Sequence, residues 1–300
     1  MARLYGRRIR LQVGSIVIED LDVKFEITKT LKGLSEQKAT FSIMNMSPEK
    51  AARLVSEQRG TIVEFRCGHG EELFTIYTGE IDFASYFVKA PNTEVFIQCK
   101  NIEGRSVDAT WEKSYPPLTP WSQVVDDLVR ATGFGRGNID VYLPIFRVQG
   151  SRLARYGTSV SGNAWNALVY LFASSELNIS VVDGVITVSP LDGSEARVTG
   201  QLKVPLLNPD TGLLGDPKLV QKTQATGGKA KVAVVTLLEI QCIIQPGIVP
   251  GAKIRLESRL YKADAIVQSA TWQGETYSDE FRINIEAAPT AVVTGGQEEI

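Results

Sequence analysis

The sequence predicts an α+β, mainly β protein, in which two small β-barrel domains flank an α/β domain. Apolar and polar residues alternate through the first hundred residues, which indicates antiparallel strands with one buried face. After about residue 105 the spacing becomes that of amphipathic helices, and the alternation returns from about residue 200. The predicted domains are therefore 1–104, 105–199 and 200–288, followed by a flexible C-terminal tail over 289–300.

Short strands fill the first predicted domain. One short helix interrupts them, with Ser47 as its N-cap, Pro48 at the first helical position and Gly60 just past its end. A closed or nearly closed barrel is the natural way for so many short strands to hide their edges. Strands are expected at 9–13, 21–28, 39–43, 62–67, 73–78, 81–88 and 94–99.

Two helices and a hairpin make up the predicted middle domain. The first helix spans about 120–132, ends at Gly133 and is expected to bury Trp121. The second spans about 163–175 and is expected to bury Trp165. Asp183-Gly184 lies between two strand-forming runs and predicts a tight hairpin turn.

Strands return in the last predicted domain, at 232–244, 253–258, 261–272 and 280–285. The segment 221–231 is rich in Gly, Thr, Gln and Lys, which predicts a mobile loop. From Pro289 onward the chain has little apolar content, which predicts a flexible tail.

The first and last thirds share an internal echo. The residue pair Ile81 and Ala84 matches Val267 and Ala270 in spacing. Gly60 and the strand after it resemble Gly251 and its strand, and 94–99 resembles 280–285. Two interpretations remain open: any two β-meanders share alternation, or the chain holds a duplicated barrel with an α/β insertion between the copies.

Composition is that of an ordinary globular protein. The 300 residues are 43% hydrophobic and 22% charged, and the net charge of −2 gives no global basic field for nucleic acid. Cys67, Cys99 and Cys242 are far apart in strand-like stretches, which favours free buried thiols. The longest apolar run, 232–244, is too short to cross a membrane, and no signal-peptide pattern follows the basic start.

No set of residues forms a catalytic or metal-binding signature, so we expect no enzyme activity, metal or cofactor. Cys67 and His69 could share a strand face, but a zinc site needs further ligands, and His69 is expected in a solvated hairpin tip. The segment 157–162 lacks the spacing of a nucleophile elbow and is expected to be a loop, and 133–137 is expected to be a helix C-cap and loop rather than a phosphate loop. Asp126 and Asp127 are adjacent on a helix and are expected on its solvated face.

Arginines crowd the start of the chain. They could bind nucleic acid, protect an edge strand or form a subunit contact, and we favour the contact because arginine is common at interfaces. The expected subunit-interface residues are Arg8, Arg10, Arg255 and Arg259.

Three stretches of the chain resemble the baseplate hub proteins of contractile-tailed phages, a group that includes the late control protein D type and the N-terminal region of VgrG. The first is Phe41-Ser42-Ile43-Met44-Asn45-Met46-Ser47-Pro48. The second is Gly79-Glu80-Ile81-Asp82, then Val95-Phe96-Ile97-Gln98-Cys99 and the polar turn 101–105. The third is Gly212-Leu213-Leu214-Gly215-Asp216-Pro217, then Ile243-Ile244-Gln245-Pro246 and Val249-Pro250-Gly251. The resemblance covers roughly residues 5–287.

The resemblance implies a structural role rather than catalysis. It implies a homotrimer whose barrels form a pseudo-six-fold ring between a six-fold tail tube and a three-fold spike, in a virion tail baseplate assembled in the host cytoplasm. The implied partners are the tail tube protein, the central spike protein, baseplate wedge proteins and a tape measure protein. DNA is expected to pass through the lumen without specific binding, and no membrane insertion is expected. The alternatives are a cell-wall hydrolase component of the same apparatus and an unrelated β-rich binding module.

Overall fold

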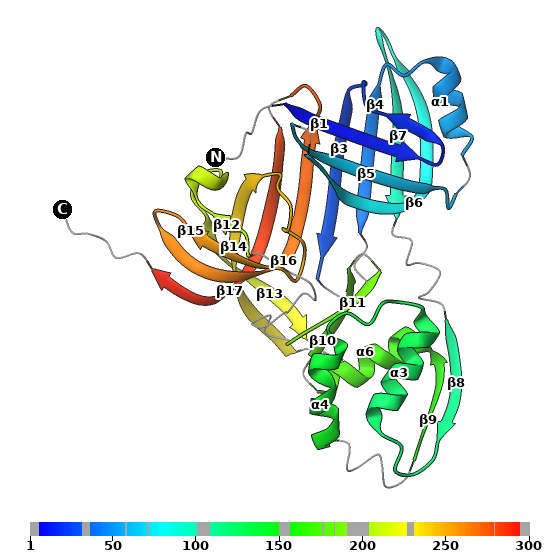
Figure 1. Ribbon diagram of the computed structural model, residues 1–300, viewed down its shortest axis with the longest axis vertical. Helices are drawn as coiled ribbons and strands as arrows, with labels where there is room; N and C mark the ends of the chain where they lie inside the picture. The colour runs from blue at the N-terminus through cyan, green and yellow to red at the C-terminus, as the bar shows by residue number, and fades with distance from the viewer. Residues whose placement is uncertain are drawn as a thin grey trace, which may run out of the picture.

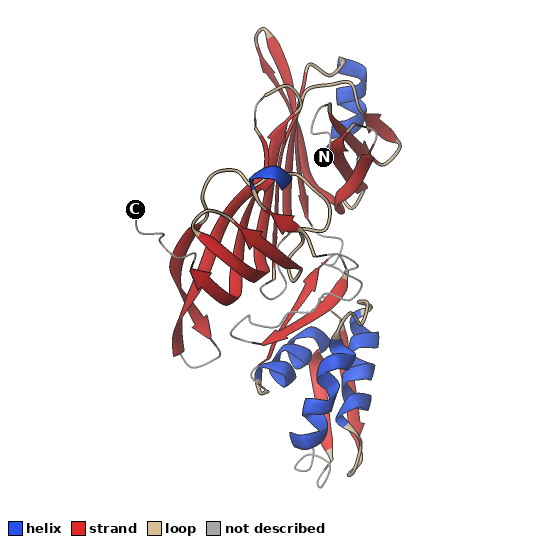
Figure 2. Ribbon diagram, turned by 60° about the vertical axis from the view of Figure 1, so that its left-hand side comes forward, coloured by secondary structure: helices blue, strands red, loops and turns tan. Residues whose placement is uncertain are grey.

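The structure is a computed structural model (Figure 1). It describes residues 6–31, 37–57, 59–70, 72–100, 109–149, 157–175, 177–182, 184–190, 204–226, 231–278 and 280–294. The predicted boundaries near 104 and 199 and the turn 101–105 lie outside these ranges. The mainly β, α+β class is confirmed, and most helices gather at one end of the molecule (Figure 2).

The first third contains the predicted strands and the predicted short helix. Burial alternates along the strands as the sequence pattern requires, with Phe25, Phe41 and Phe65 at the centre of the core. Pro48 begins the helix as expected, although Ser47 makes no side-chain cap hydrogen bond. The elements are β1 (Arg7–Val13), β2 (Ile16–Ile18), β3 (Val23–Thr30), β4 (Lys38–Met44), α1 (Pro48–Val55), β5 (Ile62–His69), β6 (Glu72–Lys89) and β7 (Asn92–Lys100).

The middle module lies at one end of the long axis of the molecule and has its own hydrophobic core (Figure 1). Trp165 is buried in that core, whereas Trp121 is only half-buried against it. The Asn163 side chain caps the second predicted helix by accepting a hydrogen bond from the backbone N–H of Asn166 at 2.8 Å. The elements are β8 (Thr110–Tyr115), α3 (Trp121–Thr132), α4 (Ile139–Gln149), β9 (Thr158–Asn163), α6 (Ala164–Ala173), β10 (Leu177–Val182) and β11 (Val185–Pro190).

Three elements of this module, β8, α4 and β9, were not predicted. The segment 158–163 is strand β9, not a loop, because it pairs with β8 along its whole length. Helix α4 contains Pro144, which normally argues against a helix interior. The helix C-cap at Gly133, with φ of 73°, and the hairpin of β10 and β11 are as predicted.

The last third is more ordered than the sequence suggested. Strand β13 (Lys218–Thr226) covers residues 221–226 of the predicted mobile loop, and Lys231 begins the next strand. The loop prediction is therefore wrong for these residues, while 227–230 lie outside the described residues. Strand β17 (Phe281–Thr294) covers the start of the predicted tail, so the tail prediction is wrong for 289–294, while 295–300 lie outside the described residues. The remaining elements are β12 (Leu206–Leu207), the 3-10 helix η1 (Pro209–Thr211), β14 (Lys231–Ile243), β15 (Lys253–Glu257) and β16 (Tyr261–Glu275).

The two outer thirds share a single sheet rather than forming separate sheets. Within the described residues the strand order is β13-β14-β17-β16-β3-β4-β7-β6-β5-β1-β2, with β15 beside β16 and β12 beside β15. One core cluster runs through both thirds and includes Phe41 and Trp272. The division into two barrels remains a prediction.

The internal echo corresponds to a repeated strand arrangement. The order β3-β4-β7-β6-β5 in the first third matches β13-β14-β17-β16-β15 in the last. An irregularity in strand pairing follows Ile81 in β6 and, at the matching place, Val267 in β16. The backbone N–H of Gly60 donates to the carbonyl of Ile81, and the N–H of Gly251 donates to the carbonyl of Val267. These matched details favour duplication over a chance similarity of alternation.

The structure corrects the echo in one strand. Ala84 lies opposite Ile97, but its counterpart Ala270 lies opposite Ile285, not Ile283 as the sequence match required. The connection after β16 is two residues longer than that after β6, since Gly274 pairs with Phe281 where Val88 pairs with Thr93. A shift of two residues preserves alternation, so the sequence pattern could not reveal it.

Candidate functional site: the joint and open edges of the sheet

The two copies of the repeat are joined by pairing of β3 with β16. The C-terminal half of β16, Ser269 to Glu275, pairs antiparallel with β3, and Trp272 lies opposite Ile27. The Trp272 and Ile27 side chains are 1% and 0% exposed. The hydroxyls of Thr28 and Thr271 are 3.2 Å apart on the other face of the same ladder. The joint therefore buries an apolar pair on one face and matches polar groups on the other.

Strand β6 has no such partner at the matching place. Among the described residues, its stretch from Phe83 to Lys89 pairs only with β7, because β5 pairs with β6 no further than Glu80. Large apolar side chains are exposed along this stretch, namely Phe83 (52%), Tyr86 (37%), Phe87 (46%) and Val88 (71%). An exposed apolar strand edge is a ready template for pairing with another chain.

Strand β13 forms the other open edge. Within the part of the chain that the structure describes, it pairs only with β14 and stands at the end of the strand order. Leu219 lies opposite the buried Leu238, so it points to the core side of the sheet, yet it remains 45% exposed. This edge and that of β6 are the counterparts of the two strands that meet in the joint.

These edges were not predicted as functional residues, although the sequence contains a signal. Three large apolar residues follow one another from Tyr86 to Val88. This run breaks the alternation of apolar and polar residues that is expected of a strand with one solvent-exposed face. A continuous apolar run is typical of a strand that is covered on both faces.

Three of the four predicted interface arginines form ion pairs within the chain. Arg10 lies 3.2 Å from Glu19, and their side chains are each 39% exposed. Arg255 lies 3.1 Å from Asp264, and Arg259 lies 3.2 Å from Asp216. Arg8 is exposed on β1. Their role at a subunit interface remains a prediction.

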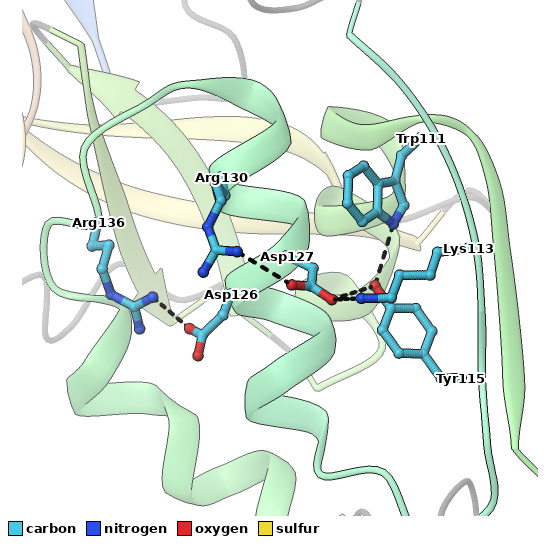
Figure 3. Close-up of polar contacts among 7 residues, drawn as sticks. All are labelled: Trp111, Lys113, Tyr115, Asp126, Asp127, Arg130 and Arg136. Carbon is cyan, nitrogen blue, oxygen red and sulfur yellow. Dashed lines mark hydrogen bonds and ion pairs between the residues drawn. The ribbon is translucent and has the colours of Figure 1, made fainter.

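A polar cluster in the middle module corrects the prediction for Asp127 (Figure 3). Asp127 is 8% exposed rather than solvated, because Lys113 donates to it at 2.6 Å and the Tyr115 hydroxyl at 3.2 Å. The Trp111 N–H donates to the Tyr115 oxygen at 3.2 Å. The hydrogen bond from Lys113 lowers the pKa of Asp127, which keeps the carboxylate ionised. Arg130 adds a more distant ion pair at 3.9 Å.

The cluster does not form a carboxylate pair. Asp126 points away from Asp127 and pairs with Arg136 (Figure 3). Arg136 also binds Asp140 at 2.6 Å. A glycosidase acid requires a raised pKa, whereas the pKa of Asp127 is lowered. The contacts of Asp127 with Lys113 and Tyr115 therefore hold β8 against α3.

A carboxylate pair does occur at a place that no sequence pattern indicated. Burial, and then the charge of Glu275, raises the pKa of Asp22. The two residues are 253 positions apart, at neighbouring ends of β3 and β16, so only the joint brings them together. Asp22 is partly buried.

The described residues contain no group of His, Cys, Asp and Glu side chains that could hold a metal. His69 lies at the predicted hairpin, but its ring is half-buried and packs edge-on against Phe281 at 5.5 Å, so the expectation of a solvated turn is wrong for its side chain. Cys67, Cys99 and Cys242 are free and buried. None of the described helices is both long and apolar enough to span a membrane.

Comparison of sequences identifies no relative: no protein family profile matches the chain, and no curated protein matches it. Comparison of structures gives a consistent class, that of phage tail and type VI secretion proteins. Because the identities are low, the likeness establishes a shared fold.

Three solved structures illustrate the likeness. The tail protein from Neisseria meningitidis MC58 is 12% identical, with a TM-score of 0.59 over 95% of this chain and 97% of that one. The 43 kDa tail protein of prophage MuSo2 from Shewanella oneidensis is 10% identical, with a TM-score of 0.58 over 96% and 97%. A type VI secretion component from E. coli, described as similar to the T4 bacteriophage tail proteins gp27 and gp5, is 11% identical, with a TM-score of 0.51 over 95% and 79%. The expected resemblance to tail and baseplate proteins is thus confirmed at the level of the overall fold.

Proposed function

We propose that the chain is the structural hub of a contractile phage or phage-like tail baseplate. In this role it is a homotrimer that adapts the six-fold tail tube to the three-fold spike, and it has no enzymatic activity. The single observation that supports this most strongly is the repeated strand arrangement within a tail-protein fold. Two similar units per chain give six similar units in three chains, which suits a partner with six-fold symmetry.

The partners proposed for the hub are the tail tube protein, the central spike protein, baseplate wedge proteins and a tape measure protein. The outer thirds of the chain would surround the lumen through which DNA passes without specific binding. The location is the virion tail baseplate, with assembly in the host cytoplasm. These proposals rest on the shared fold together with the resemblance of the sequence stretches quoted above.

Light scattering of the purified full chain tests the proposal. We expect a mass of about three times 32.8 kDa and no lytic activity on peptidoglycan. A stable monomer at all accessible concentrations contradicts the hub.

The predicted interface arginines can be tested in the same assay. Reversing the charge in the double variant Arg10→Glu and Arg255→Glu should shift the trimer toward monomer. Loss of the two exposed intrachain pairs should itself cost only about 0–1 kcal/mol each, so folding should persist. The single variant Arg53→Glu on the exposed side of α1 is the control. An unchanged trimer at low concentration removes these arginines from the interface.

The alternative function is a cell-wall hydrolase component of the same apparatus. A glycosidase needs only two carboxylates, and in the Asp22 and Glu275 pair one carboxyl has a raised pKa. The side-chain hydrogen bond between these two carboxyls is, however, closer than the roughly 5–9.5 Å that separates the carboxyls of glycosidases. Lytic activity that is abolished in the Asp22→Asn variant would support this alternative, and absence of lysis by the wild-type chain rejects it.

A further inference from the structure

The joint between β3 and β16 provides a template for the two open edges. Each position of β16 has a counterpart in β6, and Trp272 corresponds to Tyr86, since both follow the matched irregularity at the same interval. Residues 26–30 of β3 have counterparts at residues 218–222 of β13. Ile27 corresponds to Leu219, since their partners Ala39 and Leu238 match in the repeat.

The counterparts differ in burial, although they share a position in the sheet. Trp272 and Ile27 are 1% and 0% exposed where the joint covers them. Tyr86 and Leu219 are 37% and 45% exposed at the open edges. The chain thus has both strands that a second such joint requires, β6 and β13, but they lie at separate edges of the same sheet.

We infer that residues 218–222 of β13 in one copy pair antiparallel with residues 83–87 of β6 in the next copy. The register that repeats the internal joint places Tyr86 opposite Leu219 of the neighbouring copy. This inference rests on the proposed function for the number of copies, whereas the partner strands and their register come from the repeat.

The polar face of the inferred pairing is also compatible. The same register places Phe87 opposite Lys218 and Phe83 opposite Lys222 of the next copy. Lysine stems cover aromatic rings while their ammonium groups stay in water, so these pairs reduce the exposed aromatic surface. Lys222 already holds Glu239 at 3.4 Å and Glu286 at 2.6 Å, which fixes its position on the sheet.

A contact between two different surfaces of one chain is heterologous and forms a ring when the rotation closes. Pairing at every joint leaves no open β6 or β13 edge in such a ring. Closure would explain why the chain keeps an exposed apolar edge that would otherwise favour aggregation.

Disulfide trapping tests the register. Opposite residues of antiparallel strands have Cα atoms about 4.5–5.5 Å apart, within the range that a disulfide spans. We expect the double variant Tyr86→Cys and Leu219→Cys to form, on mild oxidation, a covalent trimer as the largest species. Diagonal neighbours lie about 7–8 Å apart, so the matched variant Tyr86→Cys and Gln221→Cys should stay uncrosslinked. The native Cys67, Cys99 and Cys242 are buried and should not compete.

The outcomes separate this inference from the proposed function. If light scattering shows a trimer but the Tyr86–Leu219 disulfide does not form, the inferred pairing is wrong and the proposed hub function stands. The same conclusion follows if the Tyr86/Gln221 variant gives an equal yield of disulfide. A covalent ladder beyond the trimer overturns ring closure. A monomer under reducing conditions overturns the proposed function itself.

A variant without new cysteines gives an independent test. Leu219→Arg should convert the trimer to monomer with an unchanged circular dichroism spectrum, because it places a charge in the proposed joint. Val141→Arg, on the exposed face of α4 at 54% exposure, is the matched control and should remain trimeric. A trimeric Leu219→Arg variant contradicts the pairing.

Discussion

At the residue scale, Asp126 and Asp127 show how neighbours of identical chemistry acquire different roles. One turn of α3 directs Asp127 toward Lys113 and Tyr115 on β8, while Asp126 lies on the other side with Arg136 (Figure 3). Adjacent helical residues point in directions about 100° apart, so packing on one side necessarily separates the two.

We predict that Asp127→Ala destabilises the middle module by about 1–3 kcal/mol, because the buried Tyr115 hydroxyl loses its acceptor. Asp126→Ala is the control and should cost less than about 1 kcal/mol, since its ion pair is exposed. Urea unfolding followed by tryptophan fluorescence measures both. Equal losses for the two variants would show that the cluster adds no stability.

The same carboxylate gives a pH dependence of known sign. The pKa of Asp127 is lower in the folded protein than its ordinary value of 3.8, so its contribution is present above that value and is lost as the pH falls through the folded pKa. The stability difference between wild type and Asp127→Ala should therefore shrink on acidification below about pH 4. A difference that grows with acid contradicts the assignment.

At the element scale, β17 shows how tertiary pairing orders a segment of weak local signal. Its last residues pair with the start of β16, with Tyr261 opposite Thr294 and Ala265 opposite Pro289. Composition alone predicted a tail there because Thr290 to Thr294 contain no large apolar residue apart from two valines. The partner strand supplies the ladder hydrogen bonds that local sequence cannot specify.

We predict different effects for two C-terminal truncations. Removing 289–300 should lower the melting temperature, because each lost ladder hydrogen bond costs roughly 1 kcal/mol and each kcal/mol corresponds to roughly 2–4 °C. Removing only 295–300 leaves the β16 ladder complete and should leave the melting temperature unchanged. Differential scanning calorimetry distinguishes the two truncations. Equal melting temperatures would show that residues 289–294 add no stability to the sheet.

At the scale of the whole molecule, the described residues form two large hydrophobic cores, beside a small cluster of Leu31 and Ile266. The outer thirds share a sheet and one core cluster, whereas the middle module packs its own. The insertion of the middle module between the two repeats therefore leaves their joint intact (Figure 1).

We predict that Trp165→Ala destabilises the middle module by about 3–5 kcal/mol, the usual cost of truncating a buried aromatic residue. The outer sheet should survive, because Trp165 belongs to the other core. Hydrogen exchange resolved by segment measures this, with Trp121→Ala as a milder control at a half-buried site. If all three regions lose hydrogen-exchange protection together, the middle module and the outer sheet do not unfold separately.

The sequence by itself determined the class of fold, the positions of most strands, the hairpin at Gly184 and the helix ending at Gly133, because these depend on alternation, turn chemistry and capping within a few residues. It also indicated the repeat. Tertiary structure alone decided the register of β17, the meeting of Asp22 with Glu275, and the contrast between the covered Trp272 and the exposed Tyr86. A two-residue slip leaves a period-two pattern unchanged, and a strand's own pattern does not specify which strand lies beside it, so long-range pairing decides both.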